Sequence, residues 1–158
     1  MNVELRLSAD DAQVIKDLWP LYQQDLSVFA VLEQGGSLDS WWRDPRSLFP
    51  YLITVDGSPA GFNLIAARSR IPAEIRADFV VHEFFVLRAY RGGPTAERAA
   101  VDGFDRHRGE WEVVTYPTHQ RAIAFWRRVV GRYTTRYTEA EVDHAWGRRV
   151  AFRFNNAT

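Results

Sequence analysis

The stretch from His82 to Ala96, HEFFVLRAYRGGPTA, decides the fold of this chain. It begins as an apolar strand, passes through a basic turn that contains Gly92 and Gly93, and leads directly into a helical pattern. A strand that feeds a helix in this way leaves backbone N–H groups unpaired at the first helical turn, with the positive end of the helix dipole behind them. Such a turn is suited to phosphate, and Arg91 adds a charged donor for a pyrophosphate. We therefore expect the function to involve a phosphate-bearing ligand.

Length and composition favour one compact domain over residues 1–158. The chain is 46% hydrophobic, which is enough for a substantial core. No apolar run approaches the roughly 20 residues that cross a bilayer, and the polar, early acidic N-terminus does not resemble a secretory signal. We expect a cytoplasmic protein without a membrane partner. With no cysteine, zinc–thiolate sites and cysteine nucleophiles are excluded, and the four histidines show no metal-ligand spacing, so we expect no metal.

The net charge is zero but unevenly distributed. Residues 1–87 carry five more acidic than basic side chains, and residues 88–158 carry five more basic than acidic ones. A basic half suits nucleic acid or a polyphosphate cofactor. Because it contains no interleaved aromatic stripe and no known nucleic-acid motif, we expect no nucleic-acid partner.

The hydrophobic pattern along the chain predicts seven strands and several helices. Ser8 is expected to cap the first helix with Asp11 as its capping-box partner, and Pro20 to end that helix and start a second, which Gly35 and Gly36 would end. Helices are also expected over 95–107 and over 120–130, where Gly131 would stop the second of them. The segment 37–50 is expected to be a loop or a broken helix. Strands are predicted at 3–7, 51–55, 59–67, 78–88, 111–116, 133–139 and 148–154, with a hairpin turn at residues 56–57.

This order of elements predicts an α/β (α+β) fold. An antiparallel meander that runs into one strand–helix–strand crossover gives a mixed, mostly antiparallel seven-stranded sheet with helices on both faces. Ligands of such sheets favour the carboxyl ends of parallel strands, which is where the phosphate-binding turn lies.

With these residues in place, the chain resembles the GNAT superfamily of N-acetyltransferases over nearly its whole length. The family's turn has the form R-x-x-G-x-G/A, and here it reads RGGPTA from Arg91 to Ala96. The strand WEVVTYP and the helix QRAIAFWRRVV are similar to the family's fifth strand and the helix that follows it. The whole combination looks like a branch of predicted acetyltransferases.

The resemblance implies a splay between the fourth and fifth strands, acetyl-CoA as cosubstrate, a primary amine as acceptor, and a monomer or homodimer. Pantetheine would pair with the fourth strand, as an added strand would. The implied cofactor-binding residues are Phe85, Val86 and Leu87 on that strand, Arg91, Gly92, Gly93, Thr95 and Ala96 at the turn, and His119 and Trp126 beyond the fifth strand.

Three positions depart from the family pattern. Pro94 replaces the first motif glycine and has no N–H to offer a phosphate, so we expect weaker CoA binding than with the full motif. Pro94 is compatible with starting the helix. His119 stands where the family often has asparagine, and it could contact the cofactor or cap a helix. Trp126 stands where the family frequently has a tyrosine that donates a proton to the thiolate. For Trp126 itself, packing in the core is the favoured role.

Acetyl transfer needs a base, a site for the oxyanion, and a proton for the thiolate. Glu83 is the first candidate base, because its aromatic neighbours on the strand would raise its pKa. It could instead pair with an arginine or bind substrate without moving a proton. His82 points to the opposite face of a regular strand from Glu83, so at most one of the two faces the cleft, and a bulge could change which one. The Val86 N–H is the simplest oxyanion donor, and Tyr133 or Tyr116 could protonate the thiolate, or water could.

The acceptor site is less defined by the sequence. Trp41, Trp42, Phe49 and Tyr51 could recognise an apolar or cationic acceptor, or form a satellite hydrophobic cluster. The leading alternative to an enzyme is a catalytically degenerate fold that acts as a CoA-binding or partner-binding module. Nucleic-acid binding by the arginine-rich half is the second alternative.

Overall fold

The computed structural model describes residues 1–29 and 37–157. Seven strands form one mixed sheet in the order β1-β2-β3-β4-β5-β7-β6. Every neighbouring pair is antiparallel except β4 and β5, which run parallel. The predicted mixed sheet is therefore confirmed. The strands are β1 (Val3–Leu7), β2 (Leu48–Val55), β3 (Ser58–Ala67), β4 (Phe79–Val86), β5 (Glu110–Thr115), β6 (Tyr137–His144) and β7 (Gly147–Asn155).

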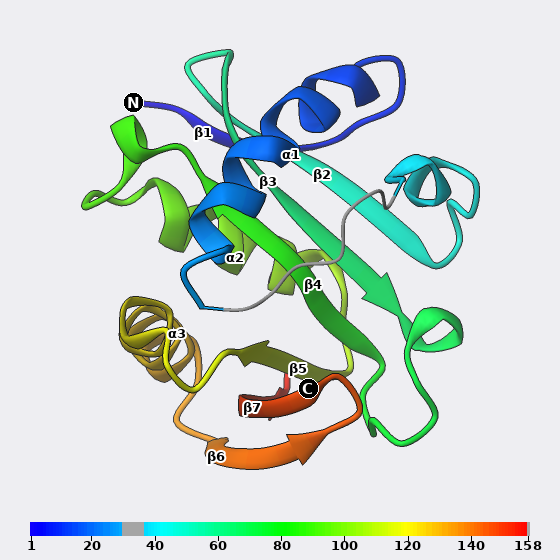
Figure 1. Ribbon diagram of the computed structural model, residues 1–158, viewed down its shortest axis with the longest axis vertical. Coiled ribbons are helices and arrows are strands. Elements are labelled where there is room, and N and C mark those ends of the chain that lie inside the picture. The colour runs from blue at the N-terminus through cyan, green and yellow to red at the C-terminus, as the bar shows by residue number, and fades with distance from the viewer. Residues whose placement is uncertain (30–36, 158) are drawn as a thin grey trace.

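Helices cover both faces of the sheet (Figure 1). The α-helices are α1 (Ala12–Leu26), α2 (Thr95–Arg106) and α3 (Gln120–Tyr133), and short 3-10 helices lie at Asp39–Trp42, Arg68–Arg70 and Arg88–Tyr90. Ile15 of α1 belongs to a buried cluster with Phe62, Leu64 and Phe85 on one face. The other cluster joins α2 and α3 to the opposite face. Because strand side chains alternate between faces, β3 is buried on both sides and its interior is almost entirely apolar.

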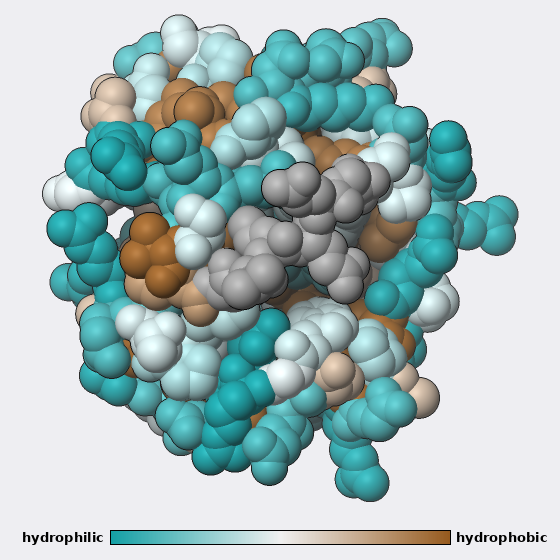
Figure 2. All heavy atoms as spheres, viewed as in Figure 1, coloured by the Kyte–Doolittle hydropathy of each residue, from teal (hydrophilic) through white to brown (hydrophobic). Residues whose placement is uncertain are grey.

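The surface agrees with this layered arrangement. On the face seen in Figure 2, hydrophilic residues form most of the outline, and apolar surface is confined to separate small areas. Within the described ranges, no helix is both long enough and apolar enough to cross a membrane.

The predicted break at Pro20 is wrong. Pro20 lies inside α1, which continues without interruption to Leu26. Proline removes one helical hydrogen bond, but Trp19 and Tyr22 on either side of it both pack against Phe62 of the sheet. Packing of one continuous stripe therefore outweighs the local cost of the proline. The predicted end of this stretch at Gly35 and Gly36 lies outside the described residues.

The predicted capping box at Ser8 is also wrong. Asp11 is the N-cap residue of α1, and its side chain makes no capping bond. Ser8 is instead buried, where its hydroxyl donates to the Pro50 carbonyl at 2.8 Å and accepts from the Trp42 indole at 3.0 Å. The serine connects β1 to the start of β2 rather than starting a helix.

Gly131 does not stop α3, and residues 133–136 are not part of a strand. The helix continues to Tyr133, and β6 begins only at Tyr137. A Cβ at Gly131 would meet the Tyr137 ring no closer than 3.5 Å, so the glycine is neither a required close approach nor a helix end. The predicted loop over 37–50 contains a 3-10 helix, and β2 begins within it at Leu48.

Candidate active site

The parallel strands β4 and β5 part after three residue pairs. The pairs are Phe79 with Trp111, Val80 with Glu112 and Val81 with Val113. Beyond them β4 continues to Val86 and β5 to Thr115 without pairing with each other. The predicted splay is therefore present, and the diverging strands can be followed in Figure 1. Two cavities lie at this opening, and both are lined by Tyr22 and Leu26 of α1.

The larger cavity has a volume of about 710 Å³ and extends from the end of β4 to the N-termini of α2 and α3. Its walls include Phe84, Val86, Arg91, Ala96, His119 and Trp126. The structure thus brings together most of the residues that the sequence predicted to hold a cofactor.

The turn before α2 keeps its first N–H groups available. Pro94 is the N-cap residue at φ −80°, no side chain caps the helix, and the first hydrogen bond along the helix runs from the Arg98 N–H to the Pro94 carbonyl at 3.0 Å. Gly92 has φ +83°, a conformation that other residues rarely adopt. The N–H groups of Thr95 and Ala96 precede that first bond, so the site can receive an anion although Pro94 contributes no donor.

Arg91 is fixed at the end of β4 by two contacts. Its Nε donates to the Val86 carbonyl and its terminal nitrogen to Asp25, both at 2.7 Å. Arg88 lies 3.2 Å from the same carboxylate. Burial raises the pKa of Asp25, but the hydrogen bonds from Arg91 and Arg88 outweigh it and hold the pKa below its usual value. Asp25 therefore remains ionised and ties the end of α1 to the arginines of the turn.

The backbone of β4 faces the cavity at Val86. The Leu87 N–H donates to the Ala60 carbonyl of β3 at 2.7 Å. Because backbone groups point alternately to the two sides of a strand, the Val86 N–H points to the open side. Of the predicted trio Phe85, Val86 and Leu87, only Val86 turns its backbone to the cleft, and Phe85 places its ring in the core under α1.

His119 caps α3, which is one of the two roles predicted for it. Its Nδ1 accepts from the Ala122 N–H at 3.3 Å, and its ring stacks on Phe29 with centroids 3.9 Å apart. Burial lowers the pKa of His119, and the charges of Arg121 and Arg91 lower it further. A neutral imidazole is required for this cap, because Nδ1 must accept.

Trp126 lies at the floor of the larger cavity. It is 5% exposed and meets the Phe84 ring edge-on at a centroid distance of 5.1 Å. This packing joins α3 to β4 beneath the opening, which agrees with the core role.

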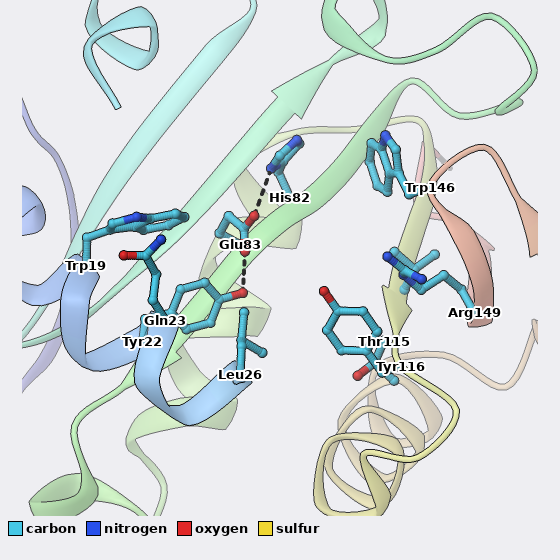
Figure 3. A pocket seen from close by; sticks show the side chains of 11 residues that line it. Trp19, Tyr22, Gln23, Leu26, His82, Glu83, Thr115, Tyr116, Trp146 and Arg149 are labelled. Carbon is cyan, nitrogen blue, oxygen red and sulfur yellow. Dashed lines mark hydrogen bonds and ion pairs between the residues drawn. The ribbon is translucent and has the colours of Figure 1, made fainter. Parts of the chain in front are cut away.

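The smaller cavity, of about 310 Å³, contains the predicted base (Figure 3). The Tyr22 hydroxyl donates a hydrogen bond to Glu83 Oε2, and His82 Nδ1 lies 3.4 Å from Glu83 Oε1. Burial raises the pKa of Tyr22 well above its usual value, and the charge of Glu83 raises it further. The phenol therefore stays protonated at neutral pH.

His82 and Glu83 line the same cavity, which corrects the expectation that at most one could. Leu64 pairs with Glu83 and the next residue, Ile65, pairs with Val81, so His82 is an extra residue in β4. Such a bulge breaks the strict alternation of the strand. It turns both side chains toward the opening between β4 and β5.

Tyr133 is not brought together with Glu83. It lines neither cavity, and its hydroxyl donates to Asp105 at 2.8 Å and accepts from Asn156 at 3.1 Å. Tyr116, the other tyrosine considered for the proton, does line the cavity of Glu83. Trp41, Trp42, Phe49 and Tyr51 line neither cavity. They are divided between the two core clusters, Trp41 and Trp42 in one and Phe49 and Tyr51 in the other, and do not form one satellite cluster.

The side chains of the smaller cavity that sequence reasoning missed include Trp19, Tyr22, Trp146 and Arg149. Trp19 and Tyr22 are three residues apart and lie on one helix face, which was a usable signal. Trp146 and Arg149 come from the β6–β7 hairpin, and nothing in the local pattern indicates that this hairpin curls back to the opening.

Several solved structures with this arrangement are described as acetyltransferases, and several hold CoA or acetyl-CoA. RimJ of Mycobacterium smegmatis, in complex with CoA-disulfide, aligns with a TM-score of 0.67 at 19% identity over 97% of this chain and 81% of its own. YncA of Salmonella typhimurium, with its cofactor acetyl-CoA, aligns with a TM-score of 0.69 at 13% identity, over 98% and 94%. The aminoglycoside acetyltransferase AAC(6')-Ib, in complex with coenzyme A and kanamycin, aligns with a TM-score of 0.63 at 16% identity, over 98% and 95%.

At these identities the likeness shows the fold alone, and this fold is also that of solved structures described as acetyltransferases of the GNAT family. No protein-family model and no curated protein matches the sequence.

Proposed function

We propose that this protein is an acetyl-CoA-dependent N-acetyltransferase that acts on a primary amine. The observation that carries the proposal is the junction of the two cavities at Tyr22, where a carboxylate, a phenol and an unpaired strand edge meet between β4 and β5. Structural neighbours with CoA or acetyl-CoA support the choice of cosubstrate.

The larger cavity fits CoA by its chemistry as well as by its size. The diphosphate would lie at the first turn of α2, with Arg91 beside it. Pantetheine would lie along the open edge of β4, which has no neighbouring strand on that side beyond Val81. At Val86 it would meet the N–H alone, because Arg91 Nε occupies the carbonyl. His119 and Trp126 would form the wall and floor. When bound, acetyl-CoA supplies the acetyl thioester.

Glu83 would act as the general base in the smaller cavity. It is 22% exposed and lies beside Tyr22, so it is accessible to an ammonium group and shielded from bulk water. The carboxylate accepts one proton from the ammonium, which frees the nitrogen lone pair to attack the thioester carbonyl. The Val86 N–H would hold the oxygen on which negative charge develops.

Tyr22 would return a proton to the departing thiolate. Its hydroxyl is bonded to Glu83, and the residue lines both cavities. The phenol donates its proton to sulfur and is recharged by the proton that Glu83 took from the ammonium, while the second nitrogen proton leaves to water. One acetamide, one thiol and one released proton balance the reaction. Tyr22 thus takes the role that the sequence assigned to Tyr133 or Tyr116.

A CoA-binding or partner-binding module is the second candidate. Three features oppose tight CoA binding. Arg91 is paired with Asp25, the His119 ring is covered by Phe29, and Pro94 provides no N–H donor at the turn. A module of this kind would retain the cavity without turnover.

Release of free thiol from acetyl-CoA over a panel of primary amines tests the two functions. An enzyme gives amine-dependent release, and Glu83→Gln abolishes it while CoA affinity is unchanged. Glu74→Gln, at an exposed carboxylate that lines neither cavity, is the matched control and keeps full activity. Saturable CoA binding with no release from any amine would replace the enzyme by the module.

A further inference from the structure

One side of the smaller cavity is acidic and aromatic. Trp19 and Tyr22 of α1 contribute ring surfaces on the side of Glu83, whose carboxylate faces the opening (Figure 3). Aromatic faces and a carboxylate are the groups that hold an ammonium ion. This side is therefore suited to the amine that is acetylated.

The opposite side carries a positive charge. Figure 3 shows Arg149 across the cavity from Glu83, on the strand that follows the β6–β7 turn. Its guanidinium carbon lies 4.4 Å from the centroid of the Tyr116 ring, and one terminal nitrogen donates to the Arg148 carbonyl at 3.0 Å. A Cβ at Gly147 would come within 3.2 Å of that nitrogen, so the glycine leaves room for the folded-back side chain.

This placement leaves the guanidinium without an acidic partner. Among residues 1–29 and 37–157, no carboxylate lies within 4.0 Å of Arg149, although it is only partly exposed. The neighbouring Arg148 is different, because it pairs with Glu141 at 2.9 Å and with Asp143 at 3.0 Å and lines neither cavity. An arginine held in a cavity by an aromatic ring and a carbonyl, with most of its donors unused, is a ready site for an anion.

We propose that the acceptor is a small amino acid, with its ammonium at Glu83 and its carboxylate at Arg149. This inference rests on the proposed function, since it names the substrate class of the same site. A cavity of about 310 Å³ suits a compact molecule. The planar guanidinium can offer a carboxylate two parallel N–H···O bonds, which an uncharged amide cannot match.

The test compares ω-amino acids of increasing chain length, beginning with glycine, each with its own primary amide. The amide keeps the size and the ammonium group and removes only the negative charge. Calorimetric titration of each pair is made with the protein alone and with the protein saturated with CoA. Arg149→Gln removes the proposed anion site, and Arg148→Gln is the matched control.

We expect at least one amino acid to bind roughly tenfold or more tightly than its amide, the ratio typical of a charge-assisted bond. Arg149→Gln should reduce this preference to near unity, and Arg148→Gln should leave it intact. Equal binding of acids and amides, persistence of the preference in Arg149→Gln, or no binding by any member of the series would overturn the proposal. Preferential binding without any acetylation would support the ligand class and remove the proposed function instead.

Discussion

Tyr22 and Glu83 lie 61 residues apart in the sequence and share a hydrogen bond from the phenol to the carboxylate. The bond joins α1 to the bulge in β4 at the point where the two cavities meet. Removal of the phenol therefore tests the proton path without removing the base.

Tyr22→Phe keeps the ring that packs against Phe62 and Phe85 and deletes only the hydroxyl. We expect kcat to fall by about 10²-fold or more, at the low end for loss of a positioned proton donor, with little change in CoA affinity. Steady-state thiol release and CoA calorimetry measure the two quantities. Tyr116→Phe is the comparison, and a larger loss there than at Tyr22 would assign the donor to Tyr116.

Gly61 of β3 controls the position of the end of β4. A Cβ at this residue would lie 1.9 Å from the Phe85 carbonyl oxygen and 2.9 Å from the Val86 Cα. Gly61→Ala must therefore displace the strand that carries the proposed oxyanion donor, and overpacking of this kind costs about 1–3 kcal/mol. Chemical denaturation should show that loss together with weaker CoA binding.

The control for Gly61→Ala is Gly131→Ala in α3, where the new Cβ would meet only ordinary contacts. It should raise the free energy of unfolding by roughly 0.5–1 kcal/mol, because glycine is unfavourable within a helix. An unaltered stability in Gly61→Ala would show that β3 and β4 are less closely apposed than described.

A buried charge cluster supports the wall of the smaller cavity. Glu112 is 1% exposed and contacts His144 at 2.5 Å and Arg153 at 2.7 Å, while His144 Nδ1 accepts from the Trp146 N–H at 3.2 Å. Glu112→Gln breaks the cluster from within, and loss of one partner of a buried pair typically costs about 3–5 kcal/mol. Because Arg153 is half exposed, the lower part of that range is expected.

The cluster also makes a functional prediction. Since it holds Trp146, Glu112→Gln should raise the KM of the acceptor while leaving CoA affinity unchanged. Glu110→Gln, two residues away at the exposed start of the same strand, serves as the control for both measurements. An unchanged acceptor KM in a folded Glu112→Gln variant would separate the cluster from the cavity wall.

The stability should depend on pH through two histidines. Burial lowers the pKa of His107 and of His119 below the ordinary value of 6.5. Below pH 6.5 the unfolded chain then binds more protons than the folded protein, so the free energy of unfolding falls as the pH falls. The contribution is complete above pH 6.5 and is lost as the pH drops through the folded-state values.

Denaturation at pH 7.5, 6.5 and 5.5 measures this dependence. His107→Gln removes the half-buried imidazole that meets the Tyr51 hydroxyl at 2.7 Å, so it should weaken the dependence of the free energy of unfolding on pH. A slope of opposite sign would mean that the folded protein stabilises the charged imidazoles.

Much of the fold could be predicted because its signals are local. The alternation in β1, the turn at Asp56 and Gly57, and the strand-to-helix sequence through Arg91 each specify their own structure, and together they leave few topologies. The phosphate end of the candidate site belongs to the same group, since turn and helix are contiguous in the chain.

The catalytic end could be predicted only in part, because it depends on contacts between distant segments. Glu83 is visible as a charge in an apolar strand, but the bulge at His82 arises from pairing with β3 and leaves no local sign. Tyr22 and Arg149 reach the opening from a helix that continues through Pro20 and from a curled hairpin. Tyr133 was predicted as a proton donor, but its hydroxyl bridges Asp105 and Asn156.

Calorimetric titration of CoA into the wild-type protein and Arg91→Gln tests the cofactor cleft most directly. Arg91 lies at the cleft wall, bonded to Val86 and Asp25. Arg148, which pairs with Glu141 and Asp143 and lines neither cavity, provides the matched control in Arg148→Gln. We predict saturable binding to the wild type and to Arg148→Gln, and affinity about tenfold or more weaker in Arg91→Gln, the loss expected for one charge-assisted phosphate contact. Absence of saturable binding to the wild type, or equal affinity in all three proteins, would contradict a CoA site between β4 and β5.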